Sequence, residues 1–113
     1  MICLKDIIEP LQCEVLCGEH MLETQEVTGG YACDLLSWVI SRVNSGEVWM
    51  TILSSVNVVA VAVLAECSCI LLTESVVMEE SVLARAREKG IAVLSTPLST
   101  YRACALIAEI TDI

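Results

Sequence analysis

The sequence contains no phenylalanine and few other aromatic residues, which limits the kind of core that it can build. Its aromatic side chains are two tryptophans and two tyrosines among 113 residues, yet 56% of the residues are hydrophobic. The core must therefore consist of Val, Leu, Ile, Ala and Cys. A mean hydropathy of +0.73 is high for a soluble monomer of this size. We therefore expect part of this aliphatic surface to be buried against a second copy, as in a homodimer.

Basic residues are also scarce. The chain has six basic residues and fifteen acidic residues, which gives a formal net charge of −9. Because no basic patch is available, this balance argues against nucleic acid and anionic membranes as partners. The longest apolar run, residues 58–65, is much shorter than the roughly 20 residues that a membrane-spanning helix needs. Charged residues interrupt the N-terminus at positions 5, 6 and 9, so we predict no signal peptide and a cytoplasmic protein.

The seven cysteines are an odd number, and they are scattered through apolar segments. They occupy positions 3, 13, 17, 33, 67, 69 and 104. This pattern favours reduced, buried thiols over a disulfide framework. Cys13 and Cys17 lie on one predicted strand about 13 Å apart, which is too far to share a metal ion. No nucleophile motif or phosphate-loop motif is present, and His20 is the only histidine, so we expect no metal, no cofactor and no enzymatic activity.

Strands and helices alternate along most of the chain. Helices are predicted at 3–9 and at 34–43, where Asp34 can cap the helix, and strands at 13–17 and 25–28. The second half predicts further strands and helices in turn at 47–53, 56–66, 69–73, 78–89, 91–95 and 98–110. This order predicts a single α/β domain over residues 1–113, with three layers (α/β/α) and a mostly parallel sheet of about five strands.

Two of the five glycines stand side by side in the stretch EVTGGYACD, residues 26–34. A strand that breaks at Gly29 and Gly30 and continues as a helix can present backbone N–H groups to a bound anion, together with Thr28. The alternative is a plain turn, or a place where another backbone approaches closely. The sequence leaves both interpretations open.

Hydroxyl-bearing residues follow several predicted strands, among them Thr51, Ser54 and Thr73, and Asn57 adds an amide. Because ligands of parallel sheets bind beyond the carboxyl ends of the strands, these side chains could form one polar crevice. The alternative is that they cap the helices that follow. If Thr28 joins them, the predicted ligand-binding residues are Thr28, Gly29, Gly30, Ser54, Asn57 and Thr73.

The segment 56–66 is apolar on every side, so its periodicity does not separate a strand from a buried helix. Its length and its three alanines favour a helix. An all-apolar helix has to be covered on both sides, by the sheet and by either a neighbouring helix or a partner subunit.

The ordered set of segments resembles the DRTGG domain family, whose fold is similar to that of the N-terminal domain of HPr kinase/phosphorylase. The matching stretches are EVTGGYACDLLSWVI (26–40), VWMTILSSVNVVAVAVLAE (48–66), ILLTES (70–75) and EKGIAVLSTPLSTYRACALIAEI (88–110). Glu26 and Val27 stand where the family motif has Asp-Arg. The resemblance implies a regulatory homodimer without established catalytic activity. It also implies either binding of a small ligand, such as a nucleotide or a phosphorylated or acyl metabolite, or a pure protein-interaction role.

Overall fold

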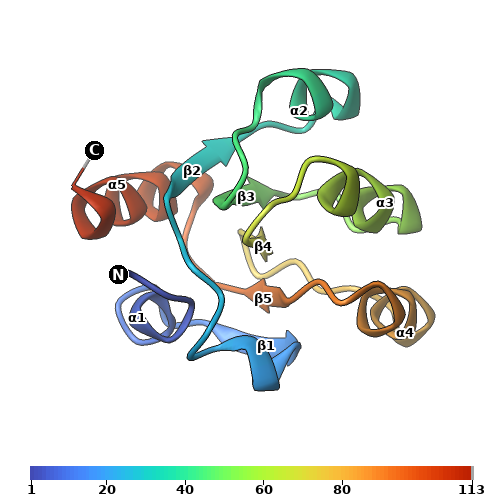
Figure 1. The fold of residues 1–113 in the computed structure, drawn as a ribbon, viewed down its shortest axis with the longest axis horizontal. Coiled ribbons are helices and arrows are strands. Elements are labelled where there is room, and N and C mark those ends of the chain that lie inside the picture. Colours follow the sequence, from blue (N-terminus) through green and yellow to red (C-terminus); the bar gives the residue numbers. More distant parts are fainter. Residues whose placement is uncertain (113) are drawn as a thin grey trace.

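A five-stranded sheet with helices on both faces forms the protein in the computed structural model, which describes residues 1–112 (Figure 1). The strands are β1 (Glu14–Cys17), β2 (Gly29–Ala32), β3 (Glu47–Thr51), β4 (Cys69–Leu72) and β5 (Val93–Ser95). The helices are α1 (Lys5–Ile8), α2 (Leu36–Arg42), α3 (Val56–Leu64), α4 (Glu80–Lys89) and α5 (Thr100–Thr111), with a short 3-10 turn, η1, at Glu19–Met21.

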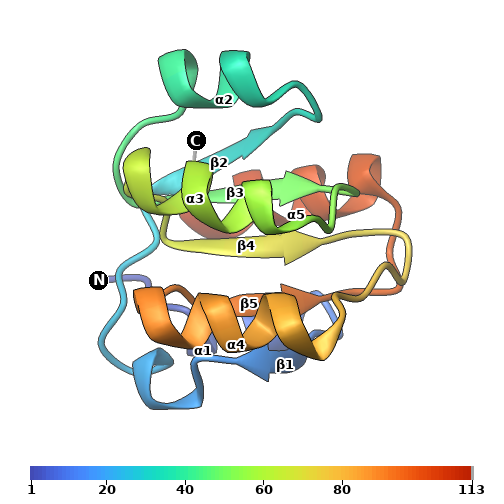
Figure 2. The same ribbon diagram turned by 90° about the vertical axis from the view of Figure 1, so that its right-hand side faces the viewer.

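The sheet has the order β1-β5-β4-β3-β2, and all of its strand pairs except β1–β5 are parallel. Helices α2, α3 and α4 cover one face, whereas α1 and α5 cover the other (Figures 1 and 2). Helices on both faces explain why all four residues of β4 are buried apolar side chains. The predicted three-layer α/β fold with a mostly parallel five-stranded sheet is confirmed.

The core consists of two mainly aliphatic layers, one on each side of the sheet, but contrary to the expectation from composition it also contains Trp49 and methionines. Trp49 and Ile70 face α2, α3 and α4, while Leu71 and Ile107 belong to the layer under α1 and α5. Trp49 is fully buried, and its indole N–H donates to the carbonyl of Cys33 at 2.9 Å. The indole nitrogen of Trp49 therefore has a hydrogen-bond partner although the ring is buried in the core.

The predicted strand at 25–28 is wrong, because the strand begins at Gly29, four residues after the predicted start, and contains both glycines. Glu26 forms only an isolated bridge with Cys3, and β2 starts at Gly29. A Cβ atom on Gly30 would lie 2.8 Å from Met50 Cε and 2.9 Å from Ile107 Cγ2. Glycine at this position therefore leaves room for the side chains of Met50 and Ile107, so that α5 packs closely on β2. The close neighbours are side chains and not the backbone that the sequence-based alternative named.

Asp34 does not cap the following helix, so that prediction is also wrong. Helix α2 begins at Leu36, and Leu35, which precedes it, makes no side-chain cap. Instead, Asp34 Oδ1 accepts hydrogen bonds from the Thr51 hydroxyl at 2.7 Å and from the Ile52 N–H at 3.1 Å. The carboxylate joins the loop after β2 to the end of β3.

The apolar segment after β3 is a helix, as its alanines predicted. Its inward side, which includes Val58 and Ala62, is fully buried against the sheet layer. Its outward side is uncovered in the single chain, where Leu64 is 73% exposed. No helix among residues 1–112 is long and apolar enough to cross a bilayer.

Candidate functional site

The six predicted ligand-binding residues do not lie at one edge of the sheet. Thr28 precedes β2, and its N–H donates to the carbonyl of Gly46 just before β3. Ser54, Asn57 and Thr73 instead follow the carboxyl ends of β3 and β4 (Figure 2). One strand length, roughly 15 Å, separates the two groups. The prediction of a single crevice that includes Thr28 is therefore wrong, because the diglycine lies within β2 rather than after it.

Most hydroxyls at the carboxyl edge of the sheet bind other parts of the chain. The hydroxyls of Thr73 and Thr100 lie 2.6 Å apart and share a hydrogen bond. Ser95 Oγ donates to the carbonyl of Val76 at 2.8 Å, and the buried Thr96 hydroxyl donates to the carbonyl of Leu11. These hydroxyls fix loops to one another and do not point into an open crevice. Ser54 is half-buried just before α3.

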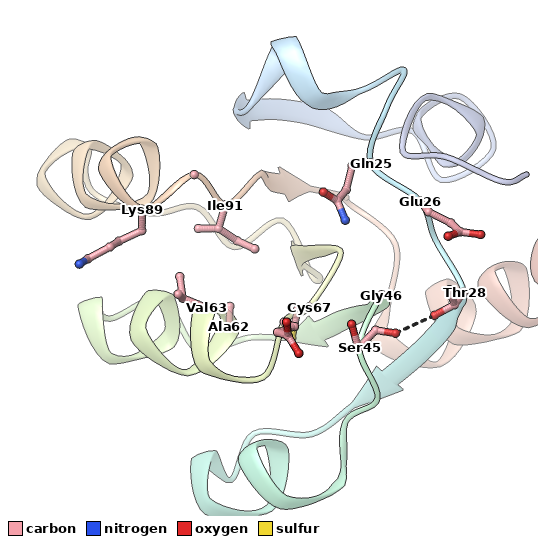
Figure 3. A pocket seen from close by; sticks show the side chains of 12 residues that line it. Gln25, Glu26, Thr28, Ser45, Gly46, Ala62, Val63, Cys67, Lys89 and Ile91 are labelled. Atoms are coloured by element: carbon pink, nitrogen blue, oxygen red, sulfur yellow. Dashed lines mark hydrogen bonds between the residues drawn. The ribbon is translucent and has the colours of Figure 1, made fainter.

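A cleft of about 430 Å³ opens at the amino edge of the sheet; we call it the amino-edge cleft (Figure 3). Its polar lining includes Gln25, Glu26, Thr28, Ser45, Glu66 and Lys89. Thr28 Oγ1 donates to the carbonyl of Ser45 at 3.2 Å, which holds the loop before β3 against the start of β2. The lining thus combines two carboxylates, two hydroxyls and an amide with one ammonium group, a set that suits a polar ligand with its own hydroxyl or amino groups.

Cys67 also lines the amino-edge cleft but is not poised as a nucleophile. Burial raises the pKa of the Cys67 thiol to about 11. The thiol is therefore protonated at neutral pH, and thiolate is the reactive form of cysteine. Among residues 1–112, no three His, Cys, Asp or Glu side chains are grouped closely enough to hold a metal ion.

A second cleft, of about 350 Å³, lies between α3 and α4; we call it the α3–α4 groove. Helix α3 gives it an apolar wall and the amide of Asn57, and α4 gives it Arg85 and Lys89. The groove shares Val63 and Lys89 with the amino-edge cleft. Figure 3 shows the Lys89 side chain extending from the end of α4 over the space between α4 and α3. The two clefts therefore meet at Lys89.

The cations of the groove are only loosely engaged. Arg85 Nη1 lies 3.2 Å from Glu88 Oε1, with side chains that are 47% and 68% exposed, so this ion pair contributes little to stability. Arg87, by contrast, makes a close 2.6 Å pair with Glu80 and lines neither cleft. Lys89 Nζ has no carboxylate of residues 1–112 within 4.0 Å. Both groove cations can therefore interact with an incoming anion.

Sequence reasoning missed Arg85, Lys89 and Glu66, because it searched for ligand contacts at strand ends and glycines. The signal that could have found the two cations is their spacing of four residues on one predicted helix, next to a helix without charges. Only the tertiary arrangement shows that these two helices are neighbours.

These observations define a small three-layer α/β domain with two connected surface clefts. The chain belongs to the DRTGG domain family, whose model matches residues 6–110. The resemblance seen in the sequence is thus confirmed. A comparison with curated proteins found no match.

A solved structure with the same fold comes from Clostridium perfringens. It contains the CBS and DRTGG domains of the regulatory region of a pyrophosphatase, in complex with its activator, diadenosine tetraphosphate. The TM-score is 0.67 at 16% sequence identity, and the match covers 93% of this chain and 45% of that chain. The chain thus spans less than half of the length of that relative, and the likeness establishes the fold.

Proposed function

We propose that the chain is a non-enzymatic regulatory module that acts as a homodimer and binds a small ligand, either a nucleotide or a phosphorylated or acyl metabolite. The family match over nearly the whole chain supports a regulatory role, because the solved relative is part of a regulatory region with a bound nucleotide activator. The observation that carries the proposal is the junction of the two clefts at Lys89, a cation without an ion pair among residues 1–112.

In this proposal the ligand lies beside Lys89, where the two clefts meet. From there it contacts either Thr28 in the amino-edge cleft or Asn57 in the α3–α4 groove. Thr28 is exposed in the amino-edge cleft, and Asn57 is exposed in the α3–α4 groove. The other predicted residues support these contacts. Gly29 and Gly30 follow Thr28 as the first residues of β2, and Ser54 lies in the loop before α3. The buried Thr73 fixes the loop after β4 to the start of α5 through its hydrogen bond with Thr100.

The second copy would cover α2 and the open edge of β2. Within residues 1–112, strand β2 pairs only with β3, and an edge strand without charges or proline is a ready partner for another strand. Next to it, Leu35, Trp38 and Ile40 are all about half exposed. Helix α2 contains no acidic residue, so two copies with a net charge of −9 can meet there with little repulsion.

Calorimetric titration with a panel of small molecules tests ligand binding. The panel consists of nucleoside mono-, di- and triphosphates, diadenosine tetraphosphate, acetyl phosphate, an acyl coenzyme and inorganic phosphate. We expect at least one member to bind with a Kd well below about 1 mM. Light scattering coupled to gel filtration should show a dimer. A dimer that binds no member of the panel contradicts the ligand-binding proposal.

The competing function is a protein-interaction module without a small-molecule ligand. The observation that favours it is the amount of exposed apolar surface, which includes Leu64 and Val77 besides the α2 residues. In that case the isolated chain would be a monomer that self-associates weakly, and the panel would give no heat of binding. The two experiments above therefore separate the two functions.

A further inference from the structure

We propose that the α3–α4 groove binds a nucleoside monophosphate unit, with the aromatic base against α3 and the phosphate between Arg85 and Lys89. This inference rests on the proposed function and narrows it to one groove and one class of ligand. It follows from three features of the groove: an apolar wall, a cation pair and an amide at the far end.

The wall that α3 presents to the groove is apolar and open. It consists of Val56, Val59, Ala60, Val63 and Leu64. Ala60 is exposed, and its small side chain leaves room between its larger neighbours. Val56 is 49% exposed and Leu64 is 73% exposed, so a flat ring laid on this wall removes apolar surface from water. A bare phosphate or sugar phosphate gains nothing from such a wall.

The cation pair lies on α4, opposite the wall. Arg85 and Lys89 are four residues apart, which places them on the same side of the helix about 6 Å from each other. A phosphate between them would accept charge-assisted hydrogen bonds from both side chains. The chain carries fifteen acidic residues against six basic ones, so a place with two available cations attracts an anion that the rest of the surface repels.

The amide of Asn57 completes the groove near the N-terminus of α3. From Asn57 to Leu64 the helix rises roughly 10 Å, which is room for a ring system followed by a phosphate. A carboxamide offers both donors and an acceptor, as the edge of a nucleobase does. This pairing distinguishes a base from the hydrocarbon part of an acyl chain, which has no hydrogen-bonding group for the amide.

Nitrogen–proton correlation NMR on the full chain tests the inference, with each common nucleoside monophosphate as the probe. We expect the largest shifts at Asn57, Ala60, Val63, Arg85 and Lys89. Ribose phosphate and the free nucleoside should each bind at least about tenfold more weakly than the best monophosphate. Equal affinity for either fragment overturns the inference, because one of the two proposed contacts then contributes nothing. Shifts confined to the carboxyl edge of the sheet overturn it as well.

Two substitutions with matched controls test the contacts. Ala60→Leu fills the groove without changing charge, and Ala84→Leu makes the same change at an exposed position of α4 outside both clefts. We expect Ala60→Leu to raise the Kd about tenfold or more and Ala84→Leu to leave it unchanged. Arg85→Gln should also raise the Kd, whereas Arg87→Gln should not. Equal effects of the variant and its control in either pair contradict the inference.

The outcome also separates this inference from the proposed function. If another panel member, such as acetyl phosphate, binds and no monophosphate does, the inference fails and the proposed function stands. If no member of the panel binds, both fail.

Discussion

At the residue scale, Gly30 is a packing position, because α5 lies directly over it. The motif that first suggested an anion cradle contains this glycine, yet its surroundings are Met50 and Ile107. The sequence shows the glycine motif but not why glycine is needed there, since the residues that pack on Gly30, Met50 and Ile107, are 20 and 77 residues away along the chain. In the same way, the Asp34 carboxylate was expected at a helix start but binds Thr51 across the sheet edge.

Gly30→Ala should lower the free energy of unfolding by about 1–3 kcal/mol, because the new methyl group overlaps two core side chains. Gly18→Ala should cost more. Its Cβ would lie 2.7 Å from the backbone Cα of Ala92, and Gly18 has a φ of 92°. Urea unfolding followed by circular dichroism measures both effects. A Gly30→Ala midpoint equal to that of the unmodified chain contradicts the packing role.

The buried thiols predict a loss of stability at alkaline pH. Burial raises the pKa of Cys13 to about 12 and that of Cys67 to about 11, from an ordinary value of 9.0. Above pH 9 the unfolded chain loses protons that the folded chain keeps, so their contribution is complete below pH 9 and declines as the pH approaches 11. We expect a lower urea midpoint at pH 10 than at pH 8. The drop should shrink in a Cys13→Ala, Cys67→Ala double variant; an undiminished drop would assign the effect to other groups.

At the element scale, the alternation of strands and helices is what the sequence predicts best. The predicted ranges of β3, β4, α4 and β5 agree with the observed ones to within two residues at each end, since each signal lies within a few neighbouring residues. Strand β2 was misplaced because its Gly-Gly-Tyr-Ala sequence has no strand-like periodicity. Its place in the sheet depends on pairing with β3.

The outer surface of α2 is the element that tests the proposed dimer. Trp38→Glu places a charge at a half-exposed position without touching the core, so we expect it to convert the dimer into a folded monomer. Ala84→Glu introduces the same charge on α4 and should leave the dimer intact. Ala62 would be a poor choice, because it is fully buried and a charge there would disrupt the fold. Light scattering measures the molar mass of the two variants. A Trp38→Glu variant that is still a dimer shows that α2 is not the dimer interface.

At the scale of the whole molecule, charge and apolar surface are unevenly divided. The net charge of −9 coexists with two helices, α2 and α3, that contain no acidic residue. The sequence predicted the excess of apolar surface, but only the fold shows where these two helices lie. Helix α2, whose one charged residue is Arg42, borders an open sheet edge, and the uncharged α3 borders a pair of cations. We assign the first surface to the second copy and the second surface to the ligand.

The central claim is that a small phosphorylated ligand binds where the two clefts meet. A crystal structure of the chain grown with the tightest-binding member of the panel tests this most directly. The account predicts ligand density beside the Lys89 ammonium, within the α3–α4 groove or the amino-edge cleft. Density at the carboxyl edge near Thr73, with Lys89 still free in solvent, would contradict it.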